Sequence, residues 1–272
     1  MRKSVNRALR GLTGYELRKA KKPVAKPVTR PEPAPAAEPA AARQPEITFP
    51  VDYDDAARDT IRTVRPWTMT SPEKLNALVY AVRYVVRHRI PGDIVECGVW
   101  RGGSMLAVAK TLAEAGDTAR HLHLYDTFEG MSEPTEHDKR HDGRSAADML
   151  AASDKSAGVW AYASFEDVRA TMRESAYPAD RIHYYRGKVE DTIPAGAPEQ
   201  ISILRLDTDW YESTRHELVH LWPRLVPGGV LLLDDYGWWD GARRAVDEWL
   251  AETNPRVLLL RMDEGRIAVK QE

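Results

Sequence analysis

Two short apolar runs that each end in acidic residues constrain most strongly what this chain can fold into. Residues 201–206 lead into Asp207, and residues 230–233 lead into Asp234 and Asp235. The stretch between the two runs has the pattern of a helix. A strand, a helix and a strand in this order predict parallel strands whose carboxyl ends share one edge, where such sheets bind ligands. Carboxylates that meet there repel one another unless a cation or proton holds them, so the pattern predicts a divalent metal site.

The rest of the chain from about residue 70 continues this alternation of strands and helices. Strands are predicted over 93–96, 121–126, 181–185, 201–206 and 230–233, helices over 74–88, 104–115, 213–225 and 241–252, and a final hairpin over 256–270. Ser71 and Pro72 are a typical cap and first residue of the first of these helices. The alternation predicts an α/β fold with a parallel sheet, to which the hairpin adds an antiparallel strand.

The ends of this pattern predict the domain organisation. Residues 1–22 are predicted to be a basic tail, residues 23–50 a Pro/Ala-rich linker, and residues 51–272 a single domain with a polar insert at about 132–176. Residues 1–30 hold ten Lys or Arg and one acid, Glu16. The tail could form an amphipathic helix that contacts an anionic membrane or a partner, and the alternative is a disordered tail.

Composition excludes several classes of protein. The net charge of −2 argues against a nucleic-acid binder, and the single cysteine, Cys97, excludes an intrachain disulfide framework. Cys97 lies in an apolar run and is predicted to be buried and inert. No signal peptide and no run of about 18 apolar residues is found, so we expect a cytoplasmic protein, with peripheral contact at the inner membrane face through the basic tail.

Three loops after predicted strands carry candidate binding residues. The glycine-bearing turn at 98–103 lets a ligand approach the backbone, although its spacing is not the dinucleotide-binding pattern. Asp126 ends the second strand, where an acid can accept hydrogen bonds from ribose hydroxyls, and the alternative is a turn cap. Residues 187–192 follow the third strand, where they would cover a base or form an ordinary solvated loop.

The acidic cluster is the best candidate for chemistry. Hard oxygen ligands from Asp207, Asp234 and Asp235 favour Mg²⁺, with Ca²⁺ or Mn²⁺ as alternatives. The competing interpretation is that these acids pair with nearby arginines, namely Arg205, Arg215, Arg243 and Arg244. Nearby aromatic residues suit an acceptor ring, and we assign Tyr236 and Trp238 to the acceptor side. In the insert, His137, Asp138, His141 and Asp142 are interpreted as solvated loop residues rather than a second metal site.

Four motifs in this order resemble the macrocin O-methyltransferase family. They are Gly-Asp-Ile-Val-Glu96-Cys-Gly-Val-Trp-Arg-Gly-Gly-Ser104, Tyr-Asp126-Thr-Phe-Glu-Gly130, Leu-Arg-Leu-Asp207-Thr-Asp-Trp-Tyr-Glu-Ser-Thr214 and Pro-Gly-Gly-Val-Leu-Leu-Leu-Asp-Asp-Tyr-Gly237. The resemblance runs from about Thr68 to the C-terminus. It implies a Rossmann-like class I methyltransferase fold with a mostly parallel seven-stranded sheet and helices on both faces. It also implies S-adenosylmethionine, Mg²⁺, a sugar hydroxyl as acceptor, and a tendency to form homo-oligomers.

The resemblance assigns roles to particular residues. The donor would contact Thr68, Met69, Ser71, Glu96, Gly98, Arg101, Gly102, Ser104, Asp126, Thr127, Phe128, Gly187 and Val189. Asp207, Asp234 and Asp235 would hold the metal, and Asp207 would also be the base, with Asp209 as the alternative. Catechol methyltransferases carry a lysine where this chain has Trp210, so a lysine base at that position is excluded. Two other functions stay open: methylation of a catechol or phenol, and a non-catalytic scaffold.

Overall fold

A seven-stranded sheet forms the centre of residues 47–272 and has the strand order β3-β2-β1-β4-β5-β7-β6. Its strands are β1 (Asp93–Cys97), β2 (Leu122–Asp126), β3 (Ile182–Arg186), β4 (Ile201–Leu206), β5 (Leu225–Leu233), β6 (Leu260–Met262) and β7 (Gly265–Val269). Strands β1 to β5 pair in parallel, whereas β7 is antiparallel to both β5 and β6. The prediction of a parallel α/β sheet closed by an antiparallel hairpin is confirmed.

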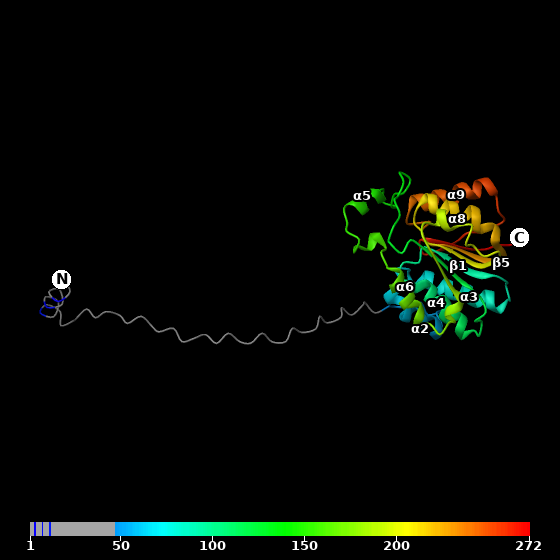
Figure 1. Ribbon diagram of the computed structural model, residues 1–272, viewed down its shortest axis with the longest axis horizontal. Coiled ribbons are helices and arrows are strands. Elements are labelled where there is room, and N and C mark those ends of the chain that lie inside the picture. The colour runs from blue at the N-terminus through cyan, green and yellow to red at the C-terminus, as the bar shows by residue number, and fades with distance from the viewer. Residues whose placement is uncertain (1–2, 4–6, 8–10, 12–46) are drawn as a thin grey trace. The chain divides into compact units, whose positions relative to one another are not determined.

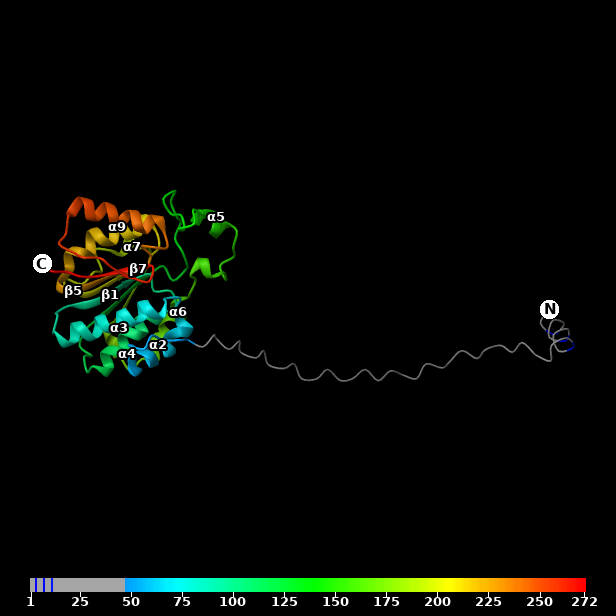
Figure 2. The ribbon, with the colours of Figure 1, turned by 180° about the vertical axis from the view of Figure 1, so that it is seen from behind.

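Helices cover both faces of this sheet, so the domain has three layers (Figures 1 and 2). One face carries α2 (Asp55–Val64), α3 (Pro72–Arg87), α4 (Gly103–Glu114) and α6 (Phe165–Arg173), and the other carries α7 (Val189–Thr192), α8 (Tyr211–Leu221) and α9 (Asp240–Thr253). Short 3-10 helices are η1 (Arg65–Trp67), η2 (Gly158–Trp160), η3 (Ala179–Arg181) and η4 (Trp222–Arg224), and α5 (Ala146–Ala151) lies in the insert, away from the sheet.

Alternation along each strand divides the core into two clusters. Ile94 of β1 points towards α3 and α4, whereas its neighbour Val95 points towards the face of α8. In β5, Leu232 and Leu231 divide in the same way. Both faces of the central strands are therefore buried, which is why these strands read as continuous apolar runs in the sequence. The sheet is held rigidly between two helix layers, and only its ends are free to bind ligands.

Helices α2, α5 and α7 were not predicted from the sequence, and two further elements differ most from their predicted positions. Strand β5 begins at Leu225, five residues before the predicted start, because the chain pairs with β4 before and after Gly228 and Gly229, which read as a turn. Helix α6 lies within the predicted insert, yet it packs beside α4 on the sheet. Its buried residues are only Val168, Thr171 and Met172, a pattern too sparse to stand out in a polar stretch. The irregular part of the insert is therefore shorter than predicted.

The structure, a computed structural model, describes residues 47–272 together with Lys3, Arg7 and Gly11. The predicted basic tail and almost all of the linker lie outside the described residues, so those predictions stay predictions. Among the described helices, none combines the length and apolar character needed to cross a membrane. Cys97 is buried, as predicted, and burial raises the pKa of its thiol well above the usual value.

Candidate active site

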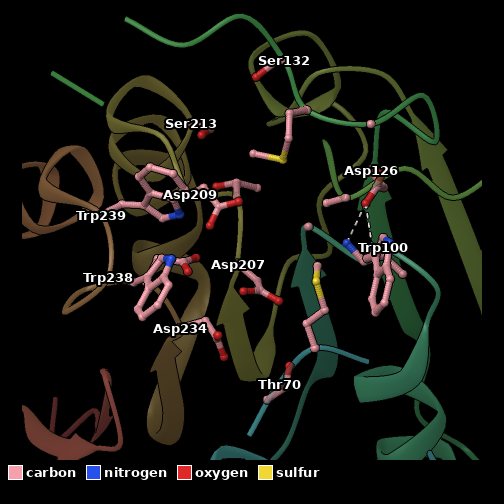
Figure 3. Close-up of a pocket in the computed structure, with 18 of the residues that line it drawn as sticks. Thr70, Trp100, Asp126, Ser132, Asp207, Asp209, Ser213, Asp234, Trp238 and Trp239 are labelled. Carbon is pink, nitrogen blue, oxygen red and sulfur yellow. Dashed lines mark hydrogen bonds between the residues drawn. The ribbon is translucent and has the colours of Figure 1, made fainter. Parts of the chain in front are cut away.

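A cavity of about 490 Å³ opens at the carboxyl ends of β1, β2, β4 and β5 (Figure 3). Its volume is that of a small-molecule or cofactor site. The structure brings most of the predicted site residues to its wall: Thr68, Met69, Ser71, Gly98, Ser104, Asp126, Thr127, Gly187, Val189, Asp207, Asp234, Asp235 and Trp238. Residues that are far apart in the sequence meet here because parallel strands end at the same edge.

Three carboxylates meet on one side of this cavity. Asp207 follows β4, and Asp234 and Asp235 follow β5, which pairs with β4 so that Leu206 lies opposite Leu233. One carboxylate oxygen of each acid lies within 4.8 Å of the others. No other group of three or more acids, histidines or cysteines in the described part of the chain has ligand atoms this close. His137, Asp138, His141 and Asp142 do not bring three ligand atoms this close. Asp138 is not a solvated loop residue as interpreted, because it is buried and accepts from the N–H groups of Thr135 and Tyr211.

Two buried basic residues, Arg205 and Lys74, pair with the acidic cluster. The guanidinium of Arg205 donates to Asp207 and Asp234, at 2.6 and 2.5 Å, and also to Glu96 at 2.6 Å. Lys74 Nζ donates to Asp234 Oδ2 at 2.8 Å and to the carbonyl oxygen of Asp234 at 2.9 Å. Within residues 47–272, Asp207 keeps one oxygen and Asp235 keeps both outside any ion pair, whereas both oxygens of Asp234 are paired, one with Arg205 and one with Lys74. Asp234 would therefore have to bind a metal through an oxygen that also accepts from a cation.

Sequence analysis did not identify Lys74. Its signal was a lysine on the apolar stripe of α3, in line with Leu78 and Val82 four and eight residues later. A basic residue on the buried face of a helix needs an acidic partner, and that partner is Asp234. Of the arginines weighed as partners, only Arg205 contacts the cluster. The other three pair elsewhere: Arg215 with Glu252, Arg243 with Asp240 and Arg244 with Glu248.

The pKa values in the cluster reflect burial and mutual repulsion. Burial raises the pKa of Asp207 and of Asp235 well above the usual value, and neighbouring carboxylates add to the effect. Burial also opposes ionisation of Asp234, but Arg205 and Lys74 outweigh it and lower the pKa of that carboxyl. Burial and the charge of Asp207 raise the pKa of Asp209 to about 7. Buried carboxylates that repel one another in this way bind a proton or a cation.

Asp126 forms the opposite side of the cavity, where the donor is expected. Its carboxylate accepts hydrogen bonds from the backbone N–H groups of Val99 and Trp100, at 2.7 and 3.0 Å, and from Phe128 at 2.7 Å (Figure 3). These hydrogen bonds show that Asp126 caps the turn, which was the alternative interpretation of this residue. The hydroxyl of Thr127 lies 3.5 Å from the same carboxylate, so all of its about four acceptor positions have partners within the chain, and a ribose hydroxyl would take the place of this long contact.

The glycines of the first turn serve the protein backbone itself. Gly98 has a φ of +81°, and a Cβ there would lie 2.0 Å from the carbonyl oxygen of Asp207. A Cβ on Gly103 would lie 2.6 Å from the backbone of Trp67. Close approach of two chain segments, rather than of a ligand, explains both residues. This packing sets the distance between the turn and the metal ligands.

Five residues assigned to the donor or acceptor do not line the cavity, and each has a different partner. Glu96 is fully buried below it and pairs with Arg205, and Arg101 points outward to the carbonyl oxygen of Pro66. Gly102 faces Val168 of α6, and Phe128 belongs to the core. Tyr236 turns away to donate a hydrogen bond to Asp247. Sequence position alone did not show these orientations.

The insert and the segment after Asp235 close the far side of the cavity. Wall residues there are mostly apolar or aromatic: Met131, Ser132, Arg140, Met149, Val159, Trp238 and Trp239. The backbone of His141 donates to the carbonyl oxygen of Trp238, and that of Asp240 donates to Lys139, at 2.9 and 2.8 Å. These two bonds fix the insert to the segment that follows the metal ligands.

Comparison with known proteins identifies the family. The macrocin O-methyltransferase family model matches residues 20–269. A tetracenomycin 4'-O-methyltransferase of Streptomyces olivaceus, which the name describes as acting on a rhamnosyl compound, is 37% identical over 67% of each chain. Demethyldecarbamoylnovobiocin O-methyltransferase of Streptomyces niveus is 31% identical over 79% of this chain and 81% of its own.

Structural comparison agrees. The O-methyltransferase NovP superposes with a TM-score of 0.66 at 29% identity, over 76% of this chain and 83% of NovP. The resemblance inferred from the four motifs is thereby confirmed, and so is the Rossmann-like class I methyltransferase fold. The chain belongs to the macrocin O-methyltransferase family, and it is an O-methyltransferase that uses S-adenosylmethionine as methyl donor.

Proposed function

We propose that this enzyme methylates a hydroxyl group of a sugar on a natural product or glycan, with Mg²⁺ held by Asp207, Asp234 and Asp235. The observation that carries the proposal is the arrangement of the cavity. The three carboxylates lie on one side, and the predicted donor segment at 68–71 and Asp126 lie on another, within one space of about 490 Å³. A donor methyl group and an acceptor hydroxyl can therefore meet inside it.

The chemistry of the three ligand side chains supports Mg²⁺. All three ligands are carboxylates, their oxygens lie within 4.8 Å of one another, and neither a cysteine nor a histidine is among them. Among the described residues, five acids, Glu96, Asp207, Asp209, Asp234 and Asp235, gather around Arg205 and Lys74, which leaves a formal excess of three negative charges when all five are ionised. A bound divalent cation would supply charge that lowers the pKa of an acceptor hydroxyl.

Asp209 is the better candidate for the base, in place of Asp207. Arg205 occupies Oδ2 of Asp207, and the metal would take the remaining oxygen. Asp209 also lines the cavity, and within residues 47–272 it forms no ion pair with a basic side chain. A carboxylate that is free of a cation can accept the hydroxyl proton as the oxygen attacks the methyl carbon, whose bond to sulfur breaks so that S-adenosylhomocysteine leaves. The chain otherwise contributes alignment of the two substrates.

The far wall supports a ring-shaped acceptor. Trp238 lines the cavity and is 38% exposed, with the guanidinium of Arg140 5.5 Å from its ring centroid, whereas Trp239 is buried against Trp210. Apolar ring faces of sugars stack on such side chains. Trp210, at the position of the catechol-enzyme lysine, is buried and donates to the carbonyl oxygen of Ser132. An aromatic wall suits a sugar and a catechol alike, so the preference for a sugar acceptor rests on the absence of the catechol-enzyme lysine and on the rhamnosyl compound of the relative's name.

The test is methyl transfer from labelled S-adenosylmethionine to two acceptor panels, each with Mg²⁺ and with a chelator. One panel contains rhamnosylated aromatic polyketides and other glycosides, and the second contains catechols and simple phenols. Transfer to glycosides that stops with the chelator supports the proposal. Transfer to catechols alone contradicts the sugar acceptor, and transfer that persists with the chelator contradicts Mg²⁺.

A further inference from the structure

Arg205 links the metal ligands to the donor side of the cavity. Its side chain is 3% exposed, and its guanidinium contacts three strands through Glu96, Asp207 and Asp234. The same Nη2 that donates to Asp234 also donates to Thr70 Oγ1 at 2.9 Å. Thr70 belongs to residues 68–71, here called the donor segment, which line the cavity between η1 and α3. One buried cation therefore contacts both the metal ligands and the donor segment.

Lys74 forms a second link between the same two parts. It lies in the first turn of α3, and the hydroxyl of Ser71, the last residue of the donor segment, caps that helix by accepting from the Lys74 N–H at 3.3 Å. The ammonium group of Lys74 donates to both the carboxylate and the carbonyl oxygen of Asp234. A shift of the donor segment would therefore move the start of α3 and pull this cation from Asp234.

The donor segment is also attached to the helix beneath the first turn. Thr70 Oγ1 lies 3.3 Å from the hydroxyl of Ser104 in α4, and Thr68 Oγ1 accepts from the Thr70 N–H at 3.0 Å. Both threonines are buried, whereas Met69 between them is 54% exposed. In one conformation, the Thr70 hydroxyl therefore contacts both Arg205 and Ser104 while Thr70 lines the cavity.

We propose that Arg205 and Lys74 couple donor binding to metal binding, so that each ligand raises the affinity of the protein for the other. The inference rests on the proposed function, because it assumes the metal at the three acids. A donor that holds residues 68–71 in place also holds Thr70 and Lys74 against Arg205 and Asp234. The carboxylates are then already oriented when the metal binds, so metal binding does not have to supply the free energy of ordering them.

The charge balance determines the sign of this coupling. Arg205 and Lys74 repel an incoming cation, but the five acids around them exceed them by three formal charges. The two cations hold the acids at a spacing that their own repulsion would otherwise widen. Positioning therefore outweighs competition for the oxygens, and the coupling is positive. Both are positioning residues, since each would act through the carboxylates that it contacts.

The test is calorimetric titration of S-adenosylhomocysteine, an unreactive donor analogue, without and with saturating MgCl₂. For the wild-type protein we expect Mg²⁺ to strengthen binding by about fivefold or more, and the analogue to strengthen Mg²⁺ binding by the same factor. In Lys74→Met and Thr70→Val the factor should fall towards one. The matched controls are Lys110→Met on α4 and Thr63→Val on α2, which lie away from the cavity and should keep the wild-type factor.

Each outcome decides between the hypotheses. If both ligands bind the wild-type protein but neither affects the other, the coupling is refuted and the proposed metal site survives. If the wild-type protein does not bind Mg²⁺ at all, the proposed function loses its metal site. Coupling that persists in both variants refutes the roles of these contacts. Thr70→Val removes only a hydroxyl, so it gives an answer even if Lys74→Met does not fold.

Discussion

At the scale of single residues, the metal ligands differ in what else holds them. Asp207 and Asp234 each pair with Arg205, whereas Asp235 forms no ion pair within residues 47–272. Removing the charge of Asp234 would leave the buried ammonium group of Lys74 without its acidic partner, at a cost of about 3–5 kcal/mol, and removing that of Asp207 would take one of three acids from Arg205. Asp235 can lose its charge without that penalty, so a substitution at Asp235 tests metal binding without leaving a buried cation unpaired.

We therefore predict that Asp235→Asn weakens Mg²⁺ binding by about tenfold or more while the protein stays folded. Calorimetric titration of MgCl₂ measures the affinity, and a thermal melt checks the fold. Asp59→Asn, on the exposed face of α2, is the control and should bind Mg²⁺ like the wild-type protein. Equal Mg²⁺ affinity in Asp235→Asn and the wild-type protein would remove Asp235 from the metal site.

Asp209 allows a test of the base. Its backbone has a φ of +69°, which asparagine adopts nearly as well as aspartate, so Asp209→Asn keeps the conformation. We expect kcat to fall by about 10²–10⁴-fold, because the amide cannot accept the proton, with little change in Mg²⁺ or S-adenosylhomocysteine affinity. Steady-state kinetics with an accepted glycoside measures the change. A variant that keeps the wild-type kcat would return the role to Asp207.

The acidic cluster could be predicted from the sequence because three ligands directly follow apolar strands. The assignments of Glu96 and Tyr236 to ligands could not be made correctly, since a strand end does not show which way a side chain turns. Glu96 points down to Arg205, and Tyr236 turns to Asp247. Lys74 was missed for a related reason: its partner, Asp234, lies 160 residues further along the chain.

At the scale of elements, the turn after β1 sets the distance between the donor side and the metal ligands. Gly98→Ala should destabilise the protein far more than Gly116→Ala, although both glycines have positive φ, +81° and +75°. A Cβ at Gly98 would collide with the Asp207 carbonyl oxygen at 2.0 Å, whereas one at Gly116 meets nothing within 4 Å. Left-handed strain costs about 1–2 kcal/mol in both.

The expected difference between these two variants is about 2 kcal/mol or more in the free energy of unfolding. Chemical denaturation of the two variants beside the wild-type protein measures it. Similar losses in both would show that the backbone near Asp207 yields easily, and the turn would then not fix the site.

The start of α2 makes stability depend on pH. Asp54 caps this helix through the Ala57 N–H at 2.9 Å and pairs with Arg83 of α3, and the hydrogen bond from Arg83 is the main cause of its lowered pKa. A carboxyl with a lowered pKa stabilises the fold above its unfolded value of about 4, and this contribution is lost as pH falls through the folded pKa.

Asp54→Asn keeps a side chain that can cap the helix but loses the ion pair. We expect its melting temperature to lie modestly below that of the wild-type protein at pH 7, with the gap closing as the pH falls to about 3. Thermal melts of both proteins across this range measure the effect. A gap that does not depend on pH would mean that the ion pair contributes nothing.

The boundaries of an element could be predicted from the sequence where a single pattern marked both of its ends. Strand β4 has the predicted bounds, 201–206, because a wholly buried apolar run ends at a charged residue. Strand β5 was predicted too short, since tertiary pairing with β4 overrides the turn signal of Gly228 and Gly229. Helix α6 was placed in the insert because only three of its nine residues are buried. Packing partners that are distant in sequence decide such cases.

At the scale of the whole molecule, charge is distributed unevenly along the chain. Residues 1–30 contain ten basic residues and one acid, whereas the chain as a whole has a net charge of −2. We predict that deleting residues 1–45 weakens sedimentation with vesicles containing anionic lipid, and that binding of the full chain falls as salt rises. Neutral vesicles are the control. Equal binding of both proteins would refute membrane docking by this segment.

The two backbone bonds between the insert and the segment after Asp235 have a consequence for engineering. They join Lys139 and His141 to Asp240 and Trp238 through main-chain atoms alone, so the connection does not depend on which side chains the insert carries. The side chains that face the acceptor can then vary while the scaffold around the metal stays the same. Segments of the insert after His141, transplanted from relatives with these two bonds kept, should therefore exchange acceptor preference and leave the donor side of the cavity unaltered.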